Sequence, residues 1–381
     1  MDINIQDLAS QCINEINKKV KNLKHLNIII AGKTGVGKST LINYIFREQL
    51  AETGIGKPVT QHMQMITKKD VPLTIYDTKG LELGRDTQKE IKAEILDKIK
   101  ECLYTKDENK CIHCIWYCIN TASDRIEEEE IEWIKEFSEE NKETQVPIIL
   151  VLTKSFSKAK AKEFKSYIDS LNLNVCNIVP VLAMDYEIDE DYVAKAYGGE
   201  ELIEIMGEVL GDELIPTLHN VQKAAIKQKV KYAQGIVATT VAASFAEGFT
   251  PIPFSDAALL VPTQVAMIAS ITAAFGIKVN KGIITSFISS ILGTAGTTML
   301  GRMIVSNVLK LVPGVGTAVG GAISGGTAAI LTTALGEAYI KLLEKMSLGE
   351  LKSTDIDSPE IKEEMKKIFK GELKKEKSKG K

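Results

Sequence analysis

A segment near the N-terminus has the residue types and spacing of a phosphate-binding loop. It matches the pattern G-x-x-x-x-G-K-[ST] at every fixed position with the residues Gly32, Lys33, Thr34, Gly35, Val36, Gly37, Lys38 and Ser39. Glycines let consecutive backbone N–H groups surround an anion, and the N-terminus of a following helix adds positive charge. We expect the Lys38 ammonium to reach the β- and γ-phosphates of a nucleotide, and the Ser39 hydroxyl to hold Mg²⁺.

The elements on either side of this loop fit the same interpretation. Residues 26–31 form an apolar, β-branched run that predicts a buried strand, and residues 40–48 predict a helix. A glycine-rich turn without a ligand is the alternative. The strand–loop–helix context favours the phosphate-binding loop.

Two further segments have the order expected of nucleotide switches. Asp77 and Gly80 match D-x-x-G after a predicted strand, so Asp77 should reach Mg²⁺ through water and the Gly80 N–H should meet the γ-phosphate. Thr60 lies between the loop helix and that strand, where a switch threonine closes on Mg²⁺. An ordinary loop threonine is the alternative for Thr60. We therefore assign Lys38, Thr60 and Gly80 to catalysis, and Ser39, Thr60 and Asp77 to the metal.

Alternating strands and helices predict the fold class. The candidate strands are 26–31, 61–67, 72–77, 112–119, 147–153 and 178–182, and amphipathic helical segments include 86–103 and 125–141. This order predicts an α/β P-loop NTPase domain whose mostly parallel sheet has helices on both faces, followed by an all-α domain rich in Gly and Ala. The expected divisions are an amphipathic helix (1–24), the nucleotide domain (25–210), an apolar helical domain (211–346) and a lysine-rich tail (347–381).

The motifs of residues 25–210 resemble a known family. The loop, the threonine near 60, the D-x-x-G motif and Thr153-Lys154 are similar to the Era-like and septin-like GTPases of the translation-factor class, and residues 115–120 with Arg125 resemble septin-like members. The resemblance implies GTP or GDP and Mg²⁺ as ligands, and GTP hydrolysis as the reaction. It also implies nucleotide contacts for Thr40, Thr153, Lys154 and Ala183.

The predicted base-binding segment departs from that family. Its guanine-binding motif is N/T-K-x-D, and Phe156 stands where the motif has Asp. Loss of the carboxylate leaves two donors of the base without a partner, at a cost on the order of 1–3 kcal/mol. Asp185 is a candidate replacement. We expect GTP as the ligand, and weaker selectivity for guanine stays open.

The catalytic segment departs as well. Leu81 follows the D-x-x-G motif where Ras-like enzymes carry a water-orienting Gln. Glu82 and Arg125 are nearby polar candidates, and an ordinary surface position is the alternative for each. The sequence therefore predicts a weak GTPase whose rate rises with protein concentration, as in a homodimer formed through the nucleotide domain.

Composition limits the partners and the compartment. The net charge of −3 argues against nucleic-acid binding, and the polar first 25 residues predict no secretory signal peptide. Cys111, Cys114 and Cys118 lie in or beside a predicted strand, where residues 111 and 114 would face opposite sides and could not clamp one metal. We interpret the six cysteines as thiols in a reducing compartment. The predicted location is cytoplasmic, with a peripheral or integral position at the inner face of a membrane as a further option.

The C-terminal region is poor in charge. Residues 233–346 hold ten charged side chains in 114 residues, about 9% against 25% for the whole chain. The charge-free runs 257–277, 283–301 and 311–336 approach the roughly 20 residues that span a bilayer. A compact helical bundle with a Gly/Ala-rich core is the alternative.

The same region resembles an uncharacterised helical domain that follows the GTPase in some bacterial proteins. The residues that carry this similarity are Gly248-x-x-Pro251-Ile252-Pro253-x-Ser255-Asp256-Ala257 and Leu260-x-x-x-Gln264. The overall layout is also similar to immunity-related and dynamin-type GTPases. Three functions are compatible with these features. The first is a GTPase switch whose helical domain engages membrane or self-associates. The second is a GTP-dependent docking module for a protein or ribosomal partner, and the third is a self-assembling or pore-forming protein whose assembly depends on the NTPase.

Overall fold

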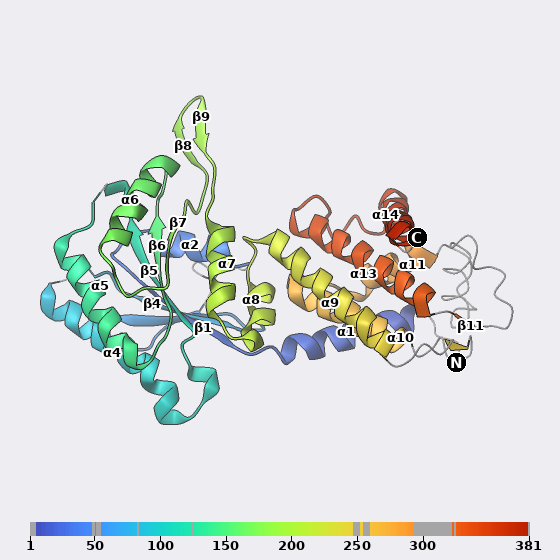
Figure 1. The fold of residues 1–381 in the computed structure, drawn as a ribbon, viewed down its shortest axis with the longest axis horizontal. Helices are drawn as coiled ribbons and strands as arrows, with labels where there is room; N and C mark the ends of the chain where they lie inside the picture. The colour runs from blue at the N-terminus through green and yellow to red at the C-terminus, as the bar shows by residue number, and fades with distance from the viewer. Residues whose placement is uncertain are drawn as a thin grey trace. The chain divides into compact units, whose positions relative to one another are not determined.

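The computed structural model describes residues 5–47, 50, 55–81, 84–123, 125–246, 252–253, 260–292, 322–323 and 325–379. The chain forms two compact units (Figure 1). Residues 23–225 form one, called here the sheet unit. Residues 1–22 and 226–381 form the other, called here the helical unit.

The sheet unit is built on a seven-stranded sheet in the order β2-β3-β4-β1-β5-β6-β7. The strands are β1 (Leu26–Ala31), β2 (Ile55–Pro58), β3 (Met63–Thr67), β4 (Leu73–Thr78), β5 (Cys114–Asn120), β6 (Ile148–Thr153) and β7 (Asn177–Pro180). The strands from β4 to β7 are parallel, whereas β2 and β3 add to the edge as antiparallel strands. The prediction of a mostly parallel α/β sheet is therefore confirmed.

Helices cover both faces because the central strands are apolar on both sides. All six residues of β1 are buried, with Ile28 and Ile30 facing one core and Ile29 facing the other. The first core is covered by α2 (Lys38–Ile45), α7 (Gly199–Val209) and α8 (Ile215–Val221). The second is covered by α4 (Arg85–Thr105), α5 (Glu128–Glu140) and α6 (Lys158–Ser170).

The alternating pattern did not reveal two elements of this unit. The short strand β2 pairs with β3, and the turn between them holds Thr60, whose N–H donates to Met63 O at 3.2 Å. A hairpin of β8 (Tyr186–Asp189) and β9 (Tyr192–Ala194) follows β7 and is visible beyond α6 in Figure 1. Its strands are mostly exposed, so no buried face left a signal in the sequence.

The helical unit includes the N-terminal helix. It comprises α1 (Ile5–Lys21), α9 (Ile226–Ala246), α10 (Leu260–Phe275), α11 (Lys281–Leu292), α13 (Gly325–Ser347), α14 (Pro359–Lys379) and the short pair β10 (Ile252–Pro253) and β11 (Ala322–Ile323). The apolar stripe of α1 packs against α10 and α11 and buries Leu8, Ala9, Cys12 and Ile16. The chain therefore returns to its own N-terminus to complete this core.

The lysine-rich segment forms α14, which packs on α13 and α11. Met365, Phe369 and Leu373 are buried in the core of the helical unit. Lys345 Nζ lies 2.6 Å from Glu364 Oε1 and links α13 to α14. One face of this segment is therefore apolar and buried, although the segment as a whole is rich in charged residues.

No helix in the described part of the chain is both long and apolar enough to cross a bilayer. Parts of the three charge-free runs lie outside the described residues, namely 257–259, 293–301, 311–321 and 324. The same holds for residues 247–251 and 254–259 of the segment that resembles the bacterial helical domain.

Candidate functional site

The phosphate-binding loop joins the end of β1 to the start of α2. Gly32 has φ 137°, and a Cβ atom there would lie 2.5 Å from Cys118 O, so the loop requires glycine at this position. Gly37 has φ 106° and is the N-cap of α2. The first turn of α2 thus begins at Lys38 and directs backbone N–H groups without intrahelical partners toward the loop.

A buried cation and a half-buried aspartate lie beside the loop. Lys38, 9% exposed, donates from Nζ to Gly32 O at 2.8 Å and to Lys33 O at 3.3 Å. Asp77 is the penultimate residue of β4, and its Oδ1 is buried with no hydrogen-bond partner among the described residues. Burial raises the pKa of Asp77, while Lys38 and a hydrogen bond from Gln64 oppose the shift. A carboxylate oxygen held in this way fits a ligand that brings positive charge or a donor.

These groups open into a cavity of about 880 Å³. From the predicted set, it gathers Thr34, Gly35, Gly37, Lys38, Ser39, Thr40, Thr60, Asp77, Gly80 and Lys154. The remaining lining residues, which sequence reasoning had not assigned, are Gln61, Met63, Gln64, Thr78 and Lys79. Loop, switch and base-side residues from four separate stretches of chain therefore share one cavity, with the hydroxyl and carboxylate oxygens that Mg²⁺ favours.

The other predicted residues lie outside that lining. They are Gly32, Lys33, Val36, Thr153 and Ala183. Thr153 is buried, and its hydroxyl donates to Val36 O at 2.6 Å, which fixes the end of β6 to the phosphate-binding loop. Ala183 is half-buried in the loop after β7.

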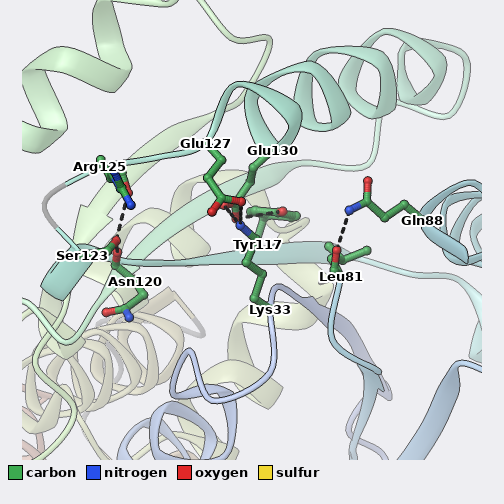
Figure 2. Close-up of polar contacts among 9 residues, drawn as sticks. All are labelled: Lys33, Leu81, Gln88, Tyr117, Asn120, Ser123, Arg125, Glu127 and Glu130. Carbon is green, nitrogen blue, oxygen red and sulfur yellow. Dashed lines mark hydrogen bonds and ion pairs between the residues drawn. The ribbon is translucent and has the colours of Figure 1, made fainter. Parts of the chain in front are cut away.

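The Lys33 side chain points to α5 (Figure 2). Its Nζ lies 2.6 Å from Glu127 Oε2 and 3.0 Å from Glu130 Oε2, and Tyr117 donates to Glu130 at 3.1 Å. Burial alone would lower the pKa of Lys33, but the two carboxylates raise it above its ordinary value. The Lys33 side chain therefore clamps the loop to the start of α5.

Thr60 is held by a glutamate of α4. Its hydroxyl donates to Glu94 of α4, and the same carboxylate oxygen accepts the His62 N–H at 3.2 Å. The His62 ring lies 3.2 Å from Glu90. Sequence reasoning missed both acids, although their spacing of four residues predicts one helix face. Thr60 is thus part of a polar network while also lining the cavity.

The segment after Gly80 contains an apolar side chain where a water-orienting group is expected. Leu81 is 2% exposed, and Gln88 donates to its carbonyl at 2.7 Å (Figure 2). Arg125 is exposed, and its carbonyl accepts a hydrogen bond from the Ser123 hydroxyl at 2.9 Å. Glu82, the other candidate, lies outside the described residues.

The cysteines are free thiols distributed through both units. Cys114 and Cys118 are buried in β5, whereas Cys111 is half-buried before it. Burial raises the pKa of Cys118 to about 12. The described residues contain no group of three His, Cys, Asp or Glu side chains arranged to hold a metal ion.

Comparisons with known families divide the chain in two. Residues 27–154 match the family described as 50S ribosome-binding GTPase, and residues 207–373 match a domain of unknown function, DUF697. The first match contains the phosphate-binding loop and both switch segments.

Similarity to individual proteins is distant. The small ribosomal subunit biogenesis GTPase RsgA of Clostridium kluyveri is 32% identical over 111 residues, covering 26% of this chain and 37% of that protein. Septin-1 of Drosophila melanogaster is 23% identical over 241 residues, covering 53% and 65%. Crystallised Toc33 from Arabidopsis thaliana is 15% identical, with a TM-score of 0.31, over 57% of this chain and 94% of that one. This chain spans little more than a third of the length of the RsgA proteins it matches.

Proposed function

This chain belongs to the P-loop GTPases and joins a GTPase domain to a helical DUF697 domain, and from that premise we propose that it is a Mg²⁺-dependent GTP switch. The observation that carries the proposal is the shared cavity. It gathers the Lys38 cation, the Ser39 hydroxyl and the Asp77 carboxylate, whose Oδ1 is buried, around the N-terminus of α2. This combination of backbone donors, cation and hard oxygen ligands suits a nucleoside triphosphate.

Ser39, Thr60 and Asp77 would hold the metal ion. The fit rests on the buried Asp77 Oδ1, which has no hydrogen-bond partner among the described residues. When bound, Mg²⁺ would neutralise charge on the β- and γ-phosphate oxygens. Lys38 would contribute the second positive charge, and the Gly80 N–H would bind the γ-phosphate. Thr60 would leave Glu94 to reach the metal, which makes its contact sensitive to the nucleotide.

Hydrolysis is proposed to be slow in a single molecule. Leu81 is buried and apolar, so its side chain cannot orient the attacking water. A second copy that contacts the GTPase domain would supply or position the missing group, and exposed Arg125 is one candidate. We expect the rate per molecule to rise with protein concentration. A constant rate per molecule over a wide concentration range would contradict activation by dimerisation.

The helical unit is the proposed output. Its chain enters the sheet unit through residues 22–25 between α1 and β1, and leaves it through residues 222–225 between α8 and α9. The two units are therefore joined by two covalent connections of four residues each. Either connection could transmit a nucleotide-dependent movement of the sheet unit to the helices. The low charge of residues 233–346 favours an output that buries apolar surface, either at a membrane surface or in self-association.

A docking role is the second candidate. The descriptions of the matching GTPase family and of RsgA both refer to the ribosome, which favours a ribosomal partner for this chain. Liposome flotation and analytical ultracentrifugation with a GTP analogue, with GDP and without nucleotide separate the candidates. If the protein neither floats nor self-associates in any state, the membrane and assembly outputs fail and docking remains.

The nucleotide proposal has its own test. Titration of the full chain with a fluorescent GTP analogue and Mg²⁺ should show saturable binding, and Lys38→Ala should weaken it by a factor on the order of 100. Lack of binding by the unmodified protein would overturn the proposed function as a whole.

A further inference from the structure

The nucleobase of a bound nucleotide would meet two loops at the carboxyl ends of β6 and β7. Ligands of parallel α/β sheets bind at this edge. Thr153 at the end of β6 is fixed to the phosphate-binding loop through Val36 O, and the next residue, Lys154, lines the phosphate cavity. With the triphosphate in the cavity, the base therefore extends toward residues 154–157 and 182–186.

An aromatic pair joins these two loops. The rings of Phe156 and Tyr186 have centroids 4.2 Å apart and planes inclined at 42°. Phe156 is half-buried and Tyr186 is 46% exposed, so the pair keeps ring surface available for a ligand. Phe156 stands at the position of the guanine-binding carboxylate, and Tyr186 is the first residue of the exposed β8–β9 hairpin.

The nearest acid in these loops is already engaged. Residues 154–157 contain no carboxylate, and residues 181–185 contain one, Asp185. Its Oδ2 lies 2.8 Å from Lys195 Nζ, and its Oδ1 accepts the Ala196 N–H at 2.9 Å. These two bonds lower the pKa of Asp185 below its ordinary range. Asp185 thus anchors the base of the hairpin, and its two contacts leave fewer acceptor positions for a base than a free carboxylate has.

We propose that Phe156 and Tyr186 form a stacking surface for the base, and that the site binds purine nucleoside triphosphates with little discrimination between GTP and ATP. This inference rests on the proposed function and concerns the same site. A carboxylate would accept two hydrogen bonds from guanine, each worth roughly ten- to a hundredfold in affinity when one partner is charged. Stacking tolerates any base because every base presents a π-face.

The test is competition of GTP, ATP and XTP against a fluorescent GTP analogue on the full chain with Mg²⁺. The affinities for GTP and ATP should differ by less than about tenfold, since no carboxylate accepts from guanine. Phe156→Asp should raise the preference for GTP over ATP by at least about tenfold. Tyr186→Ser should weaken the binding of GTP and of ATP by similar factors of about five to a hundred, since it removes one stacking ring.

Matched controls isolate the aromatic pair. Tyr167 of α6 is 48% exposed and packs on Phe164, so Tyr167→Ser removes a comparable ring that belongs to neither of the loops after β6 and β7, and it should leave both affinities unchanged. Asp185→Asn should leave the ratio of GTP to ATP affinity unchanged, which tests the inference even if Phe156→Asp fails to fold.

The results that overturn the inference are distinct from those that overturn the proposed function. A preference of the unmodified protein for GTP above about a hundredfold would refute it, because that ratio requires the missing carboxylate bonds. An unchanged ratio in Phe156→Asp, or a lost preference in Asp185→Asn, would also refute it. Failure of every triphosphate to bind would instead refute the nucleotide site.

Discussion

The clamp between the phosphate-binding loop and α5 gives a prediction whose size follows from its burial. Lys33→Met keeps the aliphatic stem but removes the ammonium that neutralises Glu127 and Glu130. The side chain of Glu130 is 9% exposed, whereas that of Glu127 is 65% exposed. Removal of Lys33 leaves Glu130 buried with the Tyr117 hydroxyl as a remaining partner. We therefore expect most of the lost unfolding free energy to come from the buried pair of Lys33 and Glu130.

The expected loss of unfolding free energy is about 2 kcal/mol. An incompletely paired buried group costs roughly 1–3 kcal/mol, and the exposed pair with Glu127 adds little because water screens it. For a domain of 150–250 residues each kcal/mol shifts Tm by about 2–4 °C, so Tm should fall by about 4–8 °C. Glu130→Gln in the Lys33→Met background should recover most of the loss, because it removes the buried charge.

Tryptophan fluorescence is the appropriate measurement. The chain has two tryptophans, and Trp116 and Trp133 both lie in the sheet unit, so their signal reports unfolding of that unit. Glu127→Gln is the exposed control and should change Tm little. Strict additivity of Lys33→Met and Glu130→Gln in the double mutant would show that the pair is not coupled and would refute the reasoning.

Three further changes test the cavity and the helical core. Lys38→Ala should lower the affinity for a fluorescent GTP analogue by a factor on the order of 100, because a buried charge-assisted contact is lost; Lys33→Met, whose ammonium faces α5, should retain it. Asp77→Asn should abolish the Mg²⁺-dependent part of GTP binding. In the unmodified protein, Mg²⁺-dependent GTP binding should weaken as pH falls, because the metal binds the ionised Asp77 carboxylate. Burial raises the pKa of Asp77, so this weakening should begin at a higher pH than it would for an exposed aspartate. A flat pH profile would contradict this. Phe369→Ala should destabilise the helical unit by about 3–5 kcal/mol in circular dichroism melts, because the ring is 2% exposed; an unchanged helical transition would show that α14 is not part of that core.

Local chemistry determined the parts of this protein that the sequence predicted well. The phosphate-binding loop is one short local segment that contains Gly32, Gly37, Lys38 and Ser39. The spacing of these residues alone is therefore enough to indicate the loop. The central strands were also located closely, for example β1 at Leu26–Ala31 and β4 at Leu73–Thr78, because residues buried on both faces form continuous apolar runs. The replacement of an aspartate by Phe156 was visible in the motif itself.

Tertiary structure decided which distant residues meet. Lys33 pairs with acids about 95 positions away, Thr60 is held by Glu94, and Asp185 is engaged by Lys195. Periodicity does not encode such partners, because they depend on strand order and on which helix faces pack together. The same reason applies to α1. The sequence predicted an amphipathic helix there, but its packing on α10, more than 200 residues later, arises only when the whole chain folds.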